Sequence, residues 1–428
     1  MIQINPREIA AEALMEIMTA EAYNNMTLRR LLRQNGAMPR QDRAFVTEVV
    51  NGTLRNLIYI DHVLNTFSKT KTEKMKPWLL AVMRSAVYQM YFMDVPDSAA
   101  CNEAVKLAGV RGYASLKGFV NGVLRTAAKK KNEIPMPETG TAEYLSVAYS
   151  HPLWLVRMWM AYYGYEDAEK ICLFDNEAPD VTIRVNTLKT NKKELKEMLE
   201  AAGVEVTEGH ISENALHLTK TADLSRLEAF QKGFFHVQDE SSQLAVKILD
   251  PQKGDTVIDL CAAPGGKSFT ASQYCGENGK LVSCDLYEQR AALTKKGAER
   301  LNIKNLQAFQ NDATVFNPDL GTFHRVLCDV PCSGFGVIRR KPEIKYKSLS
   351  EFDNLPEIQL QILETSVKYL RPEGRIMYST CTVRQAENRN VIDAFLNKHA
   401  EFEIVSEKTL MPHTDGTDGF YFCVLRGK

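Results

Sequence analysis

Two cysteines follow strand-like apolar runs in the C-terminal half of the chain. Cys332 lies in the stretch Asp329–Gly334, close to the carboxylate of Asp329, and Cys381 lies in Ser379–Thr382. In open α/β sheets, ligands bind just beyond the carboxyl ends of the strands, which is where both loops are expected. A lone cysteine is more often an inert buried residue. Two thiols in matching loops, one beside a carboxylate, instead favour a catalytic site.

A second set of residues has the pattern of a nucleoside-binding half-sheet. Thr256–Leu260 reads as a buried strand, and the small residues of Cys261–Lys267 turn from it into a helix. Small residues let the backbone approach a ligand closely. The next strand-like run, Lys280–Cys284, ends at Asp285, which is placed to bind ribose hydroxyls. Asp312 follows a further short run, where it can contact an adenine.

Two other classes of nucleotide site do not match this loop. The G-x-G-x-x-G spacing of nicotinamide enzymes is absent, because Pro264 occupies the turn. The G-x-x-x-x-G-K-[ST] phosphate loop is absent as well, because Gly265–Ser268 lacks the first glycine of that pattern. The sequence therefore argues against both a nicotinamide cofactor and a phosphate-binding loop.

Length and composition predict an ordinary globular protein of two or three domains. The chain has 428 residues, 44% hydrophobic and 25% charged. Its nine cysteines form no CxxC pairs, so we expect neither a zinc site nor a disulfide framework. Met1–Pro6 lacks the pattern of a signal peptide, and no apolar run is long enough to cross a bilayer. We expect a cytoplasmic protein with reduced thiols, no metal and no membrane association.

Charge and periodicity set the N-terminal part apart from the rest. Residues 1–140 hold 19 Lys+Arg and 13 Asp+Glu, although the whole chain is neutral. Apolar residues recur at helical spacing from about Pro6 to Lys131, which predicts a compact all-α bundle. The excess of Lys and Arg in this part, with three lysines at Lys129–Lys131, favours an RNA-binding domain. A helical dimerisation module is the alternative.

Prolines, glycines and the order of predicted helices and strands divide the chain into four parts. Glu133–Gly140 has two prolines and a glycine and reads as a linker. Trp154–Tyr163 is predicted to be an amphipathic helix with Gly164 as its cap. Alternating strands and helices then predict a small α+β unit. The predicted divisions are a helical domain over 1–132, a linker over 133–140, the α+β unit over 141–232 and a catalytic domain over 233–428.

The motifs together resemble the S-adenosylmethionine-dependent RNA cytosine-5 methyltransferases. The resemblance rests on Cys261–Lys267, Asp285, Asp312, Asp329–Gly334 and Ser379–Thr382, and it extends over the whole chain. The helical part resembles a NusB-type domain, which points to the Sun/RsmB branch of the family; its motifs are Asp42–Glu48, Gly52–Arg55, Asn102–Val105 and Phe119–Arg125. The implied fold is a NusB-like bundle, a small α+β middle unit and a C-terminal Rossmann-like class I methyltransferase domain with a mostly parallel sheet.

The resemblance also implies a cofactor and its ligands. The cofactor is S-adenosyl-L-methionine, bound by the loop after the first strand and by carboxylates that follow later strands. The implied cofactor-binding residues are Cys261, Ala262, Ala263, Pro264, Gly265, Gly266, Lys267, Asp285, Arg290, Asp312 and Asp329.

The implied reaction transfers a methyl group to carbon 5 of a specific cytidine in 16S ribosomal RNA, by resemblance cytidine 967. Carbon 5 is a poor nucleophile, so a thiolate must first add to carbon 6. By resemblance, Cys381 is this nucleophile and Cys332 assists product release. Asp329 fits the stabilisation of charge on the ring, and the Pro331 carbonyl can accept from its amine. Lys267 either lowers the pKa of a thiol or anchors the substrate backbone or the motif loops.

Two stretches are expected to contact the RNA. Arg184 and Asn186 match the RNA-facing signature that precedes the catalytic domain in this family. Arg339, Arg340 and Lys341, followed by Lys345–Lys347, read as a phosphate track beside the active site. We expect the protein to act as a monomer on naked 16S rRNA or on an early small-subunit assembly intermediate.

Two alternative functions predict different behaviour. A DNA cytosine-5 methyltransferase would use the Pro-Cys thiol, here Cys332, as its nucleophile, but the loop around Cys381 and the RNA-type N-terminal part argue against it. A non-catalytic ribosome-assembly or antitermination factor would need none of Asp329, Cys332 and Cys381.

Overall fold

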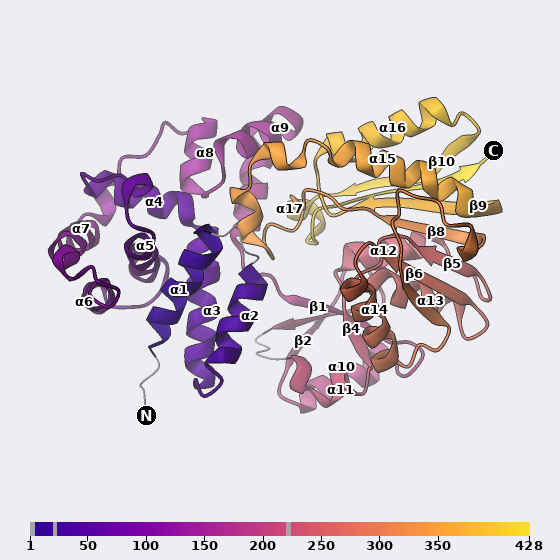
Figure 1. Ribbon diagram of the computed structural model, residues 1–428, viewed down its shortest axis with the longest axis horizontal. Helices are drawn as coiled ribbons and strands as arrows, with labels where there is room; N and C mark the ends of the chain where they lie inside the picture. Colours follow the sequence, from indigo (N-terminus) through magenta and orange to yellow (C-terminus); the bar gives the residue numbers. More distant parts are fainter. Residues whose placement is uncertain (1–4, 20–23, 220–223) are drawn as a thin grey trace. The chain divides into compact units, whose positions relative to one another are not determined.

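The computed structural model describes residues 5–19, 24–219 and 224–428 (Figure 1). Residues 1–4, which belong to the stretch considered above for a signal peptide, lie outside these ranges. The chain divides into two compact units. The first comprises Met1–Ala178 together with Ile338–Lys347, and the second comprises Pro179–Val337 together with Ser348–Lys428.

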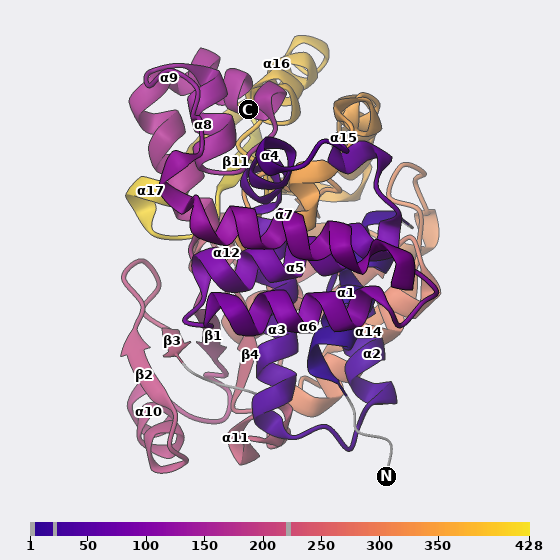
Figure 2. The same ribbon diagram turned by 90° about the vertical axis from the view of Figure 1, so that its left-hand side faces the viewer.

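The first unit is a helical bundle, as predicted for its N-terminal part. The apolar stripe of the first helix is buried, with Ile9, Leu14 and Ile17 each at most 6% exposed. Figure 2 shows α6 and α7 running beside α5, whose residue Trp78 donates from its indole to the carbonyl of Leu107. The elements are α1 (Pro6–Thr19), α2 (Asn24–Gln34), α3 (Arg40–Arg55), α4 (Leu57–Phe67), η1 (Thr72–Lys74), α5 (Pro77–Phe92), α6 (Asp97–Ala108), η2 (Ala114–Leu116), α7 (Lys117–Lys129), η3 (Lys131–Glu133), α8 (Ala142–Ala148), α9 (Leu153–Asn176) and η6 (Pro342–Tyr346).

Helix α9 is longer than the predicted helix Trp154–Tyr163, and α8 precedes it where no helix was predicted. The predicted cap Gly164 has φ 81° and ψ 173°, so it breaks the helix, but a helical stretch resumes directly after it and runs to Asn176. Both helices belong to the first unit, where α8 packs against α4. Residues 141–178, which were predicted to begin the α+β unit over 141–232, therefore group with the helices of the first unit. A local pattern cannot show which neighbour an amphipathic helix will cover.

The second unit begins with a small antiparallel sheet of order β2-β3-β1-β4. The path β1-α10-β2-β3-α11-β4 is a split β-α-β arrangement. Four of the five residues of β1 are buried, so its side chains are covered on both faces. The elements are β1 (Val181–Val185), α10 (Lys192–Ala201), β2 (Glu205–Glu208), β3 (Ala215–Thr219), η4 (Leu224–Arg226), α11 (Glu228–Gln231) and β4 (Phe235–Val237).

The larger sheet of the second unit is mostly parallel, as predicted. Its strand order is β10-β11-β9-β8-β5-β6-β7; β7, β6, β5, β8 and β9 run parallel, and β11 and β10 are antiparallel. The elements are α12 (Glu240–Leu249), β5 (Thr256–Asp259), α13 (Gly266–Cys275), β6 (Lys280–Asp285), α14 (Glu288–Leu301), β7 (Leu306–Gln310), η5 (Pro318–Leu320), β8 (Phe323–Asp329), η7 (Leu349–Phe352), α15 (Leu355–Ser366), η8 (Val367–Tyr369), β9 (Leu370–Thr380), η9 (Gln385–Glu387), α16 (Arg389–Lys398), β10 (Phe402–Leu410), α17 (Pro412–Asp415) and β11 (Phe420–Gly427).

Helices cover both faces of this sheet (Figure 1). One core joins the strands to α15 and α16 through Leu363 and Phe395, and the other joins them to α12 and α13 through Val246 and Ala271. Successive parallel strands extend the sheet outward from β5 on one side and from β8 on the other. The order therefore reverses between β5 and β8, and a ligand is expected beyond the carboxyl ends of the strands at such a reversal.

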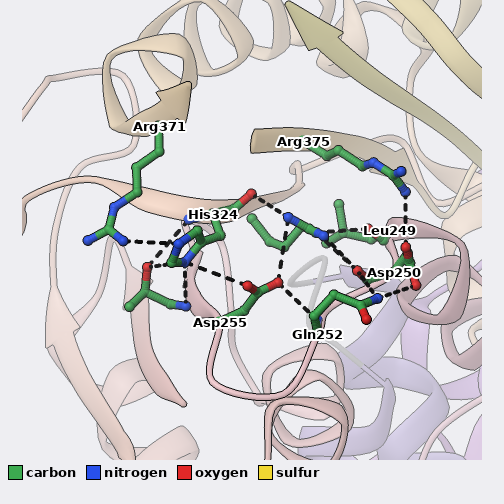
Figure 3. A network of polar contacts seen from close by, with 9 residues as sticks. Leu249, Asp250, Gln252, Asp255, His324, Arg371 and Arg375 are labelled. Atoms are coloured by element: carbon green, nitrogen blue, oxygen red, sulfur yellow. Dashed lines mark hydrogen bonds and ion pairs between the residues drawn. The ribbon is translucent and has the colours of Figure 1, made fainter. Parts of the chain in front are cut away.

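The amino ends of the strands, at the opposite edge, are tied together by polar side chains (Figure 3). Arg325 donates to the carbonyls of Leu249 and Asp250, which end α12. His324 accepts from the backbone N–H of Thr256 at 3.0 Å. These contacts satisfy helix-end carbonyls and a strand-end amide that would otherwise need water. No helix among the described residues is both long enough and apolar enough to cross a membrane.

Candidate functional site

The loop predicted to bind the cofactor connects β5 to α13, and its shape depends on Gly265. This residue has φ 107°, in the left-handed region, and a Cβ there would lie 2.3 Å from the ring of Phe269. Arg290 donates to the carbonyl of Ala263 and forms an ion pair with Asp285 at 3.1 Å. The Ala263 N–H points to the same carboxylate oxygen of Asp285 at 3.3 Å. Asp285 and Arg290 thus lie against the loop, at the end of β6.

Two more carboxylates lie at the ends of neighbouring strands. Asp312, after β7, is exposed, and one of its oxygens accepts from the backbone and the hydroxyl of Thr314. Asp259 ends β5 and is buried, and its Oδ2 accepts from the hydroxyl of Ser268 at 2.7 Å. Burial raises the pKa of Asp259 to about 7. Carboxylates at three adjacent strand ends can serve a ligand that carries hydroxyl groups and positive charge.

The two predicted thiols face each other. The Sγ atoms of Cys332 and Cys381 are 3.1 Å apart, and both residues are partly exposed. The hydrogen bond to Cys381, followed by burial, raises the pKa of Cys332 well above its usual value. The thiolate and not the thiol attacks carbon, so whichever sulfur reacts must first lose its proton.

Asp329 lies at the end of β8 beside this thiol pair. Its Oδ1 accepts from the hydroxyl of Ser379 at 2.8 Å, and its Oδ2 accepts from the ammonium of Lys267 at 2.7 Å. Lys267 also donates to Ser242 at 3.2 Å and lies 4.9 Å from the centre of the Phe420 ring. Of the two roles that the sequence left open for Lys267, this geometry matches the anchoring of the motif loops.

The RNA contacts predicted for Arg184 and Asn186 are wrong in this structure, because neither side chain reaches the surface. Arg184 is 1% exposed and lies over the ring of Tyr274 at 5.4 Å. Asn186 is 0% exposed, and its amide donates to the carbonyls of Gly233 and Leu301. Both residues hold the small sheet to its neighbours inside the second unit.

The predicted phosphate track over 339–347 is partly buried, and its Lys345 lies in the interior. Lys345 is 0% exposed, and its ammonium donates to the carbonyls of Arg55 and Ser150 and to the side chain of Asn176. Burial lowers the pKa of Lys345 to about 7. Burying an ammonium costs several kcal/mol, which these three oxygen atoms offset. Lys345 is therefore unavailable to a phosphate.

The basic residues at the start of this segment differ in exposure and in contacts. The guanidinium of Arg339 lies 4.2 Å from the centre of the Phe174 ring, and its carbonyl accepts from Arg55. Arg339 and Arg340 are partly exposed and Lys341 is exposed, so the expectation that these three residues meet RNA stays a prediction.

Several residues of the strand-end site were not predicted from the sequence. Asp259 ends its strand just as Asp285 does, so the same signal was available for it. Ser379 belongs to the Ser379–Thr382 motif, but its hydrogen bond to Asp329 was not predicted. Gln359 and Glu387 are fully buried side chains that contact the loop around Cys332. Neither lies in a pattern that distinguishes it from an ordinary helix or turn residue.

Comparisons with known proteins agree with this arrangement. The family model for the 16S rRNA methyltransferase RsmB/F matches residues 246–426, the NusB family model matches residues 4–129, and the ferredoxin-like domain model of RsmF/B-like methyltransferases matches residues 151–225. The chain is 39% identical to the probable ribosomal RNA small subunit methyltransferase B of Bacillus subtilis, over 99% of this chain and 98% of that protein. It is 31% identical to ribosomal RNA small subunit methyltransferase B of Yersinia enterocolitica, over 98% of each chain.

Solved structures share the fold. The crystal structure of PH0851 aligns over 99% of both chains with a TM-score of 0.84 and 26% identity. The crystal structure of NSun6 from Pyrococcus horikoshii with SFG has a TM-score of 0.59 and 21% identity, and the match covers 64% of this chain and 98% of that one. The predictions of a NusB-like bundle, a middle α+β unit and a mostly parallel C-terminal sheet are confirmed. The chain belongs to the 16S rRNA methyltransferase RsmB/F family.

Proposed function

We propose that this protein transfers a methyl group from S-adenosylmethionine to carbon 5 of a cytidine in 16S ribosomal RNA. The observation that carries the proposal is the pair of thiols 3.1 Å apart at the ends of β8 and β9, with the carboxylate of Asp329 beside them. Methylating an unactivated carbon of a pyrimidine requires a nucleophile, a group that stabilises charge on the ring and a base. Cys381, Asp329 and Cys332 have the chemistry for these roles.

In the proposed reaction, the Cys381 thiolate adds to carbon 6 of the cytosine, and the electron pair of the ring double bond moves toward carbon 5. S-adenosylmethionine, when bound, supplies the methyl group in an activated form. Asp329, fixed by Lys267 and Ser379, faces ring nitrogen 3 and the exocyclic amine. It passes the proton given up by the Cys381 thiol to nitrogen 3, which neutralises the negative charge that develops on the ring. The carbonyl of Pro331 already accepts from Gln359 at 2.9 Å, and its second lone pair remains for the amine.

Cys332 acts after methylation. It takes the proton from carbon 5, the bond between carbon 6 and Cys381 breaks, and the ring double bond forms again. Before Cys381 adds to the ring, its hydrogen bond is the largest cause of the raised pKa of Cys332. That cause weakens once the sulfur of Cys381 is bound to carbon. Cys332 can then lose its own proton to solvent and serve as the base.

The residues present fit the cofactor. S-adenosylmethionine carries a sulfonium, an ammonium, ribose hydroxyls and an adenine. Asp259 and Asp285 supply carboxylates beside the loop of small residues that follows β5, and Asp312 lies at the next strand end. We propose that this loop and these three carboxylates hold the cofactor, with Arg290 keeping Asp285 and the loop together.

The remaining parts of the proposal concern the partner. The relatives named above are ribosomal RNA methyltransferases, and the NusB-like part of this chain has an excess of basic residues. We propose 16S rRNA, naked or in an early small-subunit intermediate, as the substrate of a monomeric protein.

A methyl-transfer assay separates this function from the alternatives. Purified protein is incubated with labelled S-adenosylmethionine and either a 16S rRNA transcript or duplex DNA. We expect label in the RNA, at carbon 5 of one cytidine after digestion and mass spectrometry, and none in the DNA. Label in DNA, label at another atom of the base, or binding to RNA without transfer would each contradict the proposal.

A further inference from the structure

A buried carboxylate lies beneath the loop that carries Cys332. Glu387 is 0% exposed and lies in the short turn η9, which follows the Cys381 loop. Its Oε2 accepts from the backbone N–H of Ser333 at 2.8 Å and from the side-chain amide of Gln359 at 3.0 Å. Its charge also faces Arg384, at 3.6 Å from Oε1. A buried carboxylate is costly unless it is hydrogen-bonded, so these contacts must persist for Glu387 to stay in place.

Gln359 links Glu387 to Pro331, the residue on the other side of Cys332. The same amide nitrogen that donates to Glu387 also donates to the carbonyl of Pro331 at 2.9 Å. The amide oxygen of Gln359 accepts from the hydroxyl of Tyr378 at 3.3 Å, which fixes the orientation of the amide. The residues on both sides of Cys332 are therefore held by Glu387, one directly and one through Gln359.

The next residue along the chain does the same for the second thiol. Asn388 donates from its amide to the carbonyl of Thr382 at 2.9 Å and accepts from the hydroxyl of Thr380 at 2.6 Å. These are the two neighbours of Cys381. The hydroxyls of Ser333 and Thr382 also bond to each other at 2.9 Å. One dipeptide, Glu387-Asn388, thus grips both cysteine loops, one with each side chain.

The hydrogen bonds of Glu387 and Asn388 are directed at particular backbone groups, unlike the contacts of ordinary packing. Each side chain of the dipeptide contacts a different loop, and the contacts flank the reactive residue. A carboxylate in this place also affects the thiol chemically. The hydrogen bond to Cys381 and burial are the largest causes of the raised pKa of Cys332, and the negative charge of Glu387 adds to them.

We propose that Glu387 and Asn388 are positioning residues with separate tasks: Glu387 holds Cys332 in place for the release step, and Asn388 holds Cys381 in place for the attack on carbon 6. This inference rests on the proposed function. It predicts that damage to the two neighbouring residues stops the reaction at two different stages, although both lie in the same buried network.

The first test compares covalent protein–RNA adducts on denaturing gels after incubation with the RNA and S-adenosylmethionine. Glu387→Ala should resemble Cys332→Ala, with turnover reduced about 10²-fold and a methylated adduct that accumulates, because a misplacement near 1 Å costs about that much. Asn388→Ala should resemble Cys381→Ala, with less adduct formed. Glu387→Gln keeps the acceptor oxygen for Ser333 and Gln359 and should restore release. Equal loss of attack and release in both alanine variants would overturn the inference.

A second measurement does not depend on catalysis. Alkylation of Cys332 and Cys381 by iodoacetamide is followed against pH in the free enzyme, residue by residue, by mass spectrometry. Loss of the charge in Glu387→Gln should move the alkylation midpoint of Cys332 to lower pH, and Asn388→Ala should change the profile of Cys381 instead. Unchanged Cys332 profiles in both Glu387 variants would overturn the inference even where the adduct assay fails.

If Cys332→Ala itself gives no adduct, the proposed release mechanism is wrong, whereas the alkylation profiles still decide whether Glu387 controls Cys332. Thermal unfolding and calorimetric cofactor binding of each variant identify any variant that has lost its fold. Glu387→Gln is the variant that keeps the hydrogen bonds if Glu387→Ala does not fold.

Discussion

The thiol half of the strand-end site and its cofactor half are held together over different distances along the chain. Asp329, beside the thiols, bonds to Lys267, which precedes it by 62 residues, and to Ser379, which follows it by 50. Asp285, on the cofactor side, pairs with Arg290 on the helix that follows it, and Asp312 bonds to Thr314, two residues on. The thiol half thus depends on the whole fold, and much of the cofactor half on local turns. Changes in the first should stop chemistry and spare cofactor binding, and changes in the second should do the reverse.

The largest expected effect is that of Cys381→Ala. Methyl transfer to the RNA should fall by at least about 10⁴-fold, the size associated with loss of a nucleophile, and no covalent adduct should form. Cofactor affinity should stay within about twofold, because Cys381 belongs to the thiol half. The measurements are labelled-methyl transfer, a denaturing gel and calorimetry. An adduct formed by Cys381→Ala would assign the nucleophile to Cys332 and restore the DNA-type mechanism.

Cys332→Ala should give a different result at the neighbouring loop. Attack and methylation should proceed once, and the methylated adduct should accumulate because no base removes the proton from carbon 5. Turnover after the first event should fall by about 10³-fold, within the range of general-base catalysis. The check is the ratio of adduct to released product over time. Rapid release by Cys332→Ala would show that another group is the base.

Lys267→Met tests whether the ammonium acts on Asp329. Removing a charge-assisted hydrogen bond of 2.7 Å to a carboxylate costs about 1.5–3 kcal/mol, which corresponds to about 10- to 150-fold in kcat. Lys267→Arg, which keeps the charge, is the matched control and should retain more activity. Cofactor affinity, measured by calorimetry, should change less than kcat. A larger loss of affinity than of kcat would move Lys267 into the cofactor half.

Asp285→Ala is the matching change on the cofactor side. Its carboxylate holds Arg290 and the loop at Ala263, so the Kd for S-adenosylmethionine should rise by about tenfold while RNA affinity stays nearly unchanged. At saturating cofactor the adduct should still form and resolve. Unaltered S-adenosylmethionine binding in the calorimeter would remove Asp285 from the cofactor site.

The smallest effect is expected from pH. Burial raises the pKa of Asp259 to about 7, so this carboxyl is protonated below pH 7 and ionised above it. A cationic cofactor favours the ionised form, so its affinity should increase as the pH rises toward 7 and level off above it, by less than about tenfold in all. Asp259→Asn should flatten this dependence. Calorimetry between about pH 6 and pH 8 measures it, and an equal slope in both proteins would separate Asp259 from the cofactor.

The sequence predicted those site residues that directly follow a strand. Strand ends followed by Asp285, Asp329 or a cysteine loop are visible in the chain because apolar runs stop at those residues. The approach of Cys332 to Cys381 followed from the parallel sheet, which brings strand ends to one edge. Glu387 could not be identified in this way, because its partners lie on α15 and in the loop after β8, and only the tertiary structure brings them to it.

The wrong predictions share a cause. Arg184 on a strand and Lys345 in a basic run both look like surface residues, because charged side chains are rarely buried. Whether such a side chain finds acceptors inside the protein depends on elements distant in sequence, here Tyr274 for Arg184 and the carbonyls of Arg55 and Ser150 for Lys345. Periodicity cannot report those partners.

Lys345 also limits how this protein can be divided or recombined. The helical unit is not one continuous N-terminal segment. It also includes Ile338–Lys347, which follows the Cys332 loop in the sequence. A chimaera that exchanged only residues 1–178 would offer Lys345 a foreign interior without its three oxygen acceptors, and an unpaired buried ammonium is strongly destabilising. A productive exchange must therefore carry both segments.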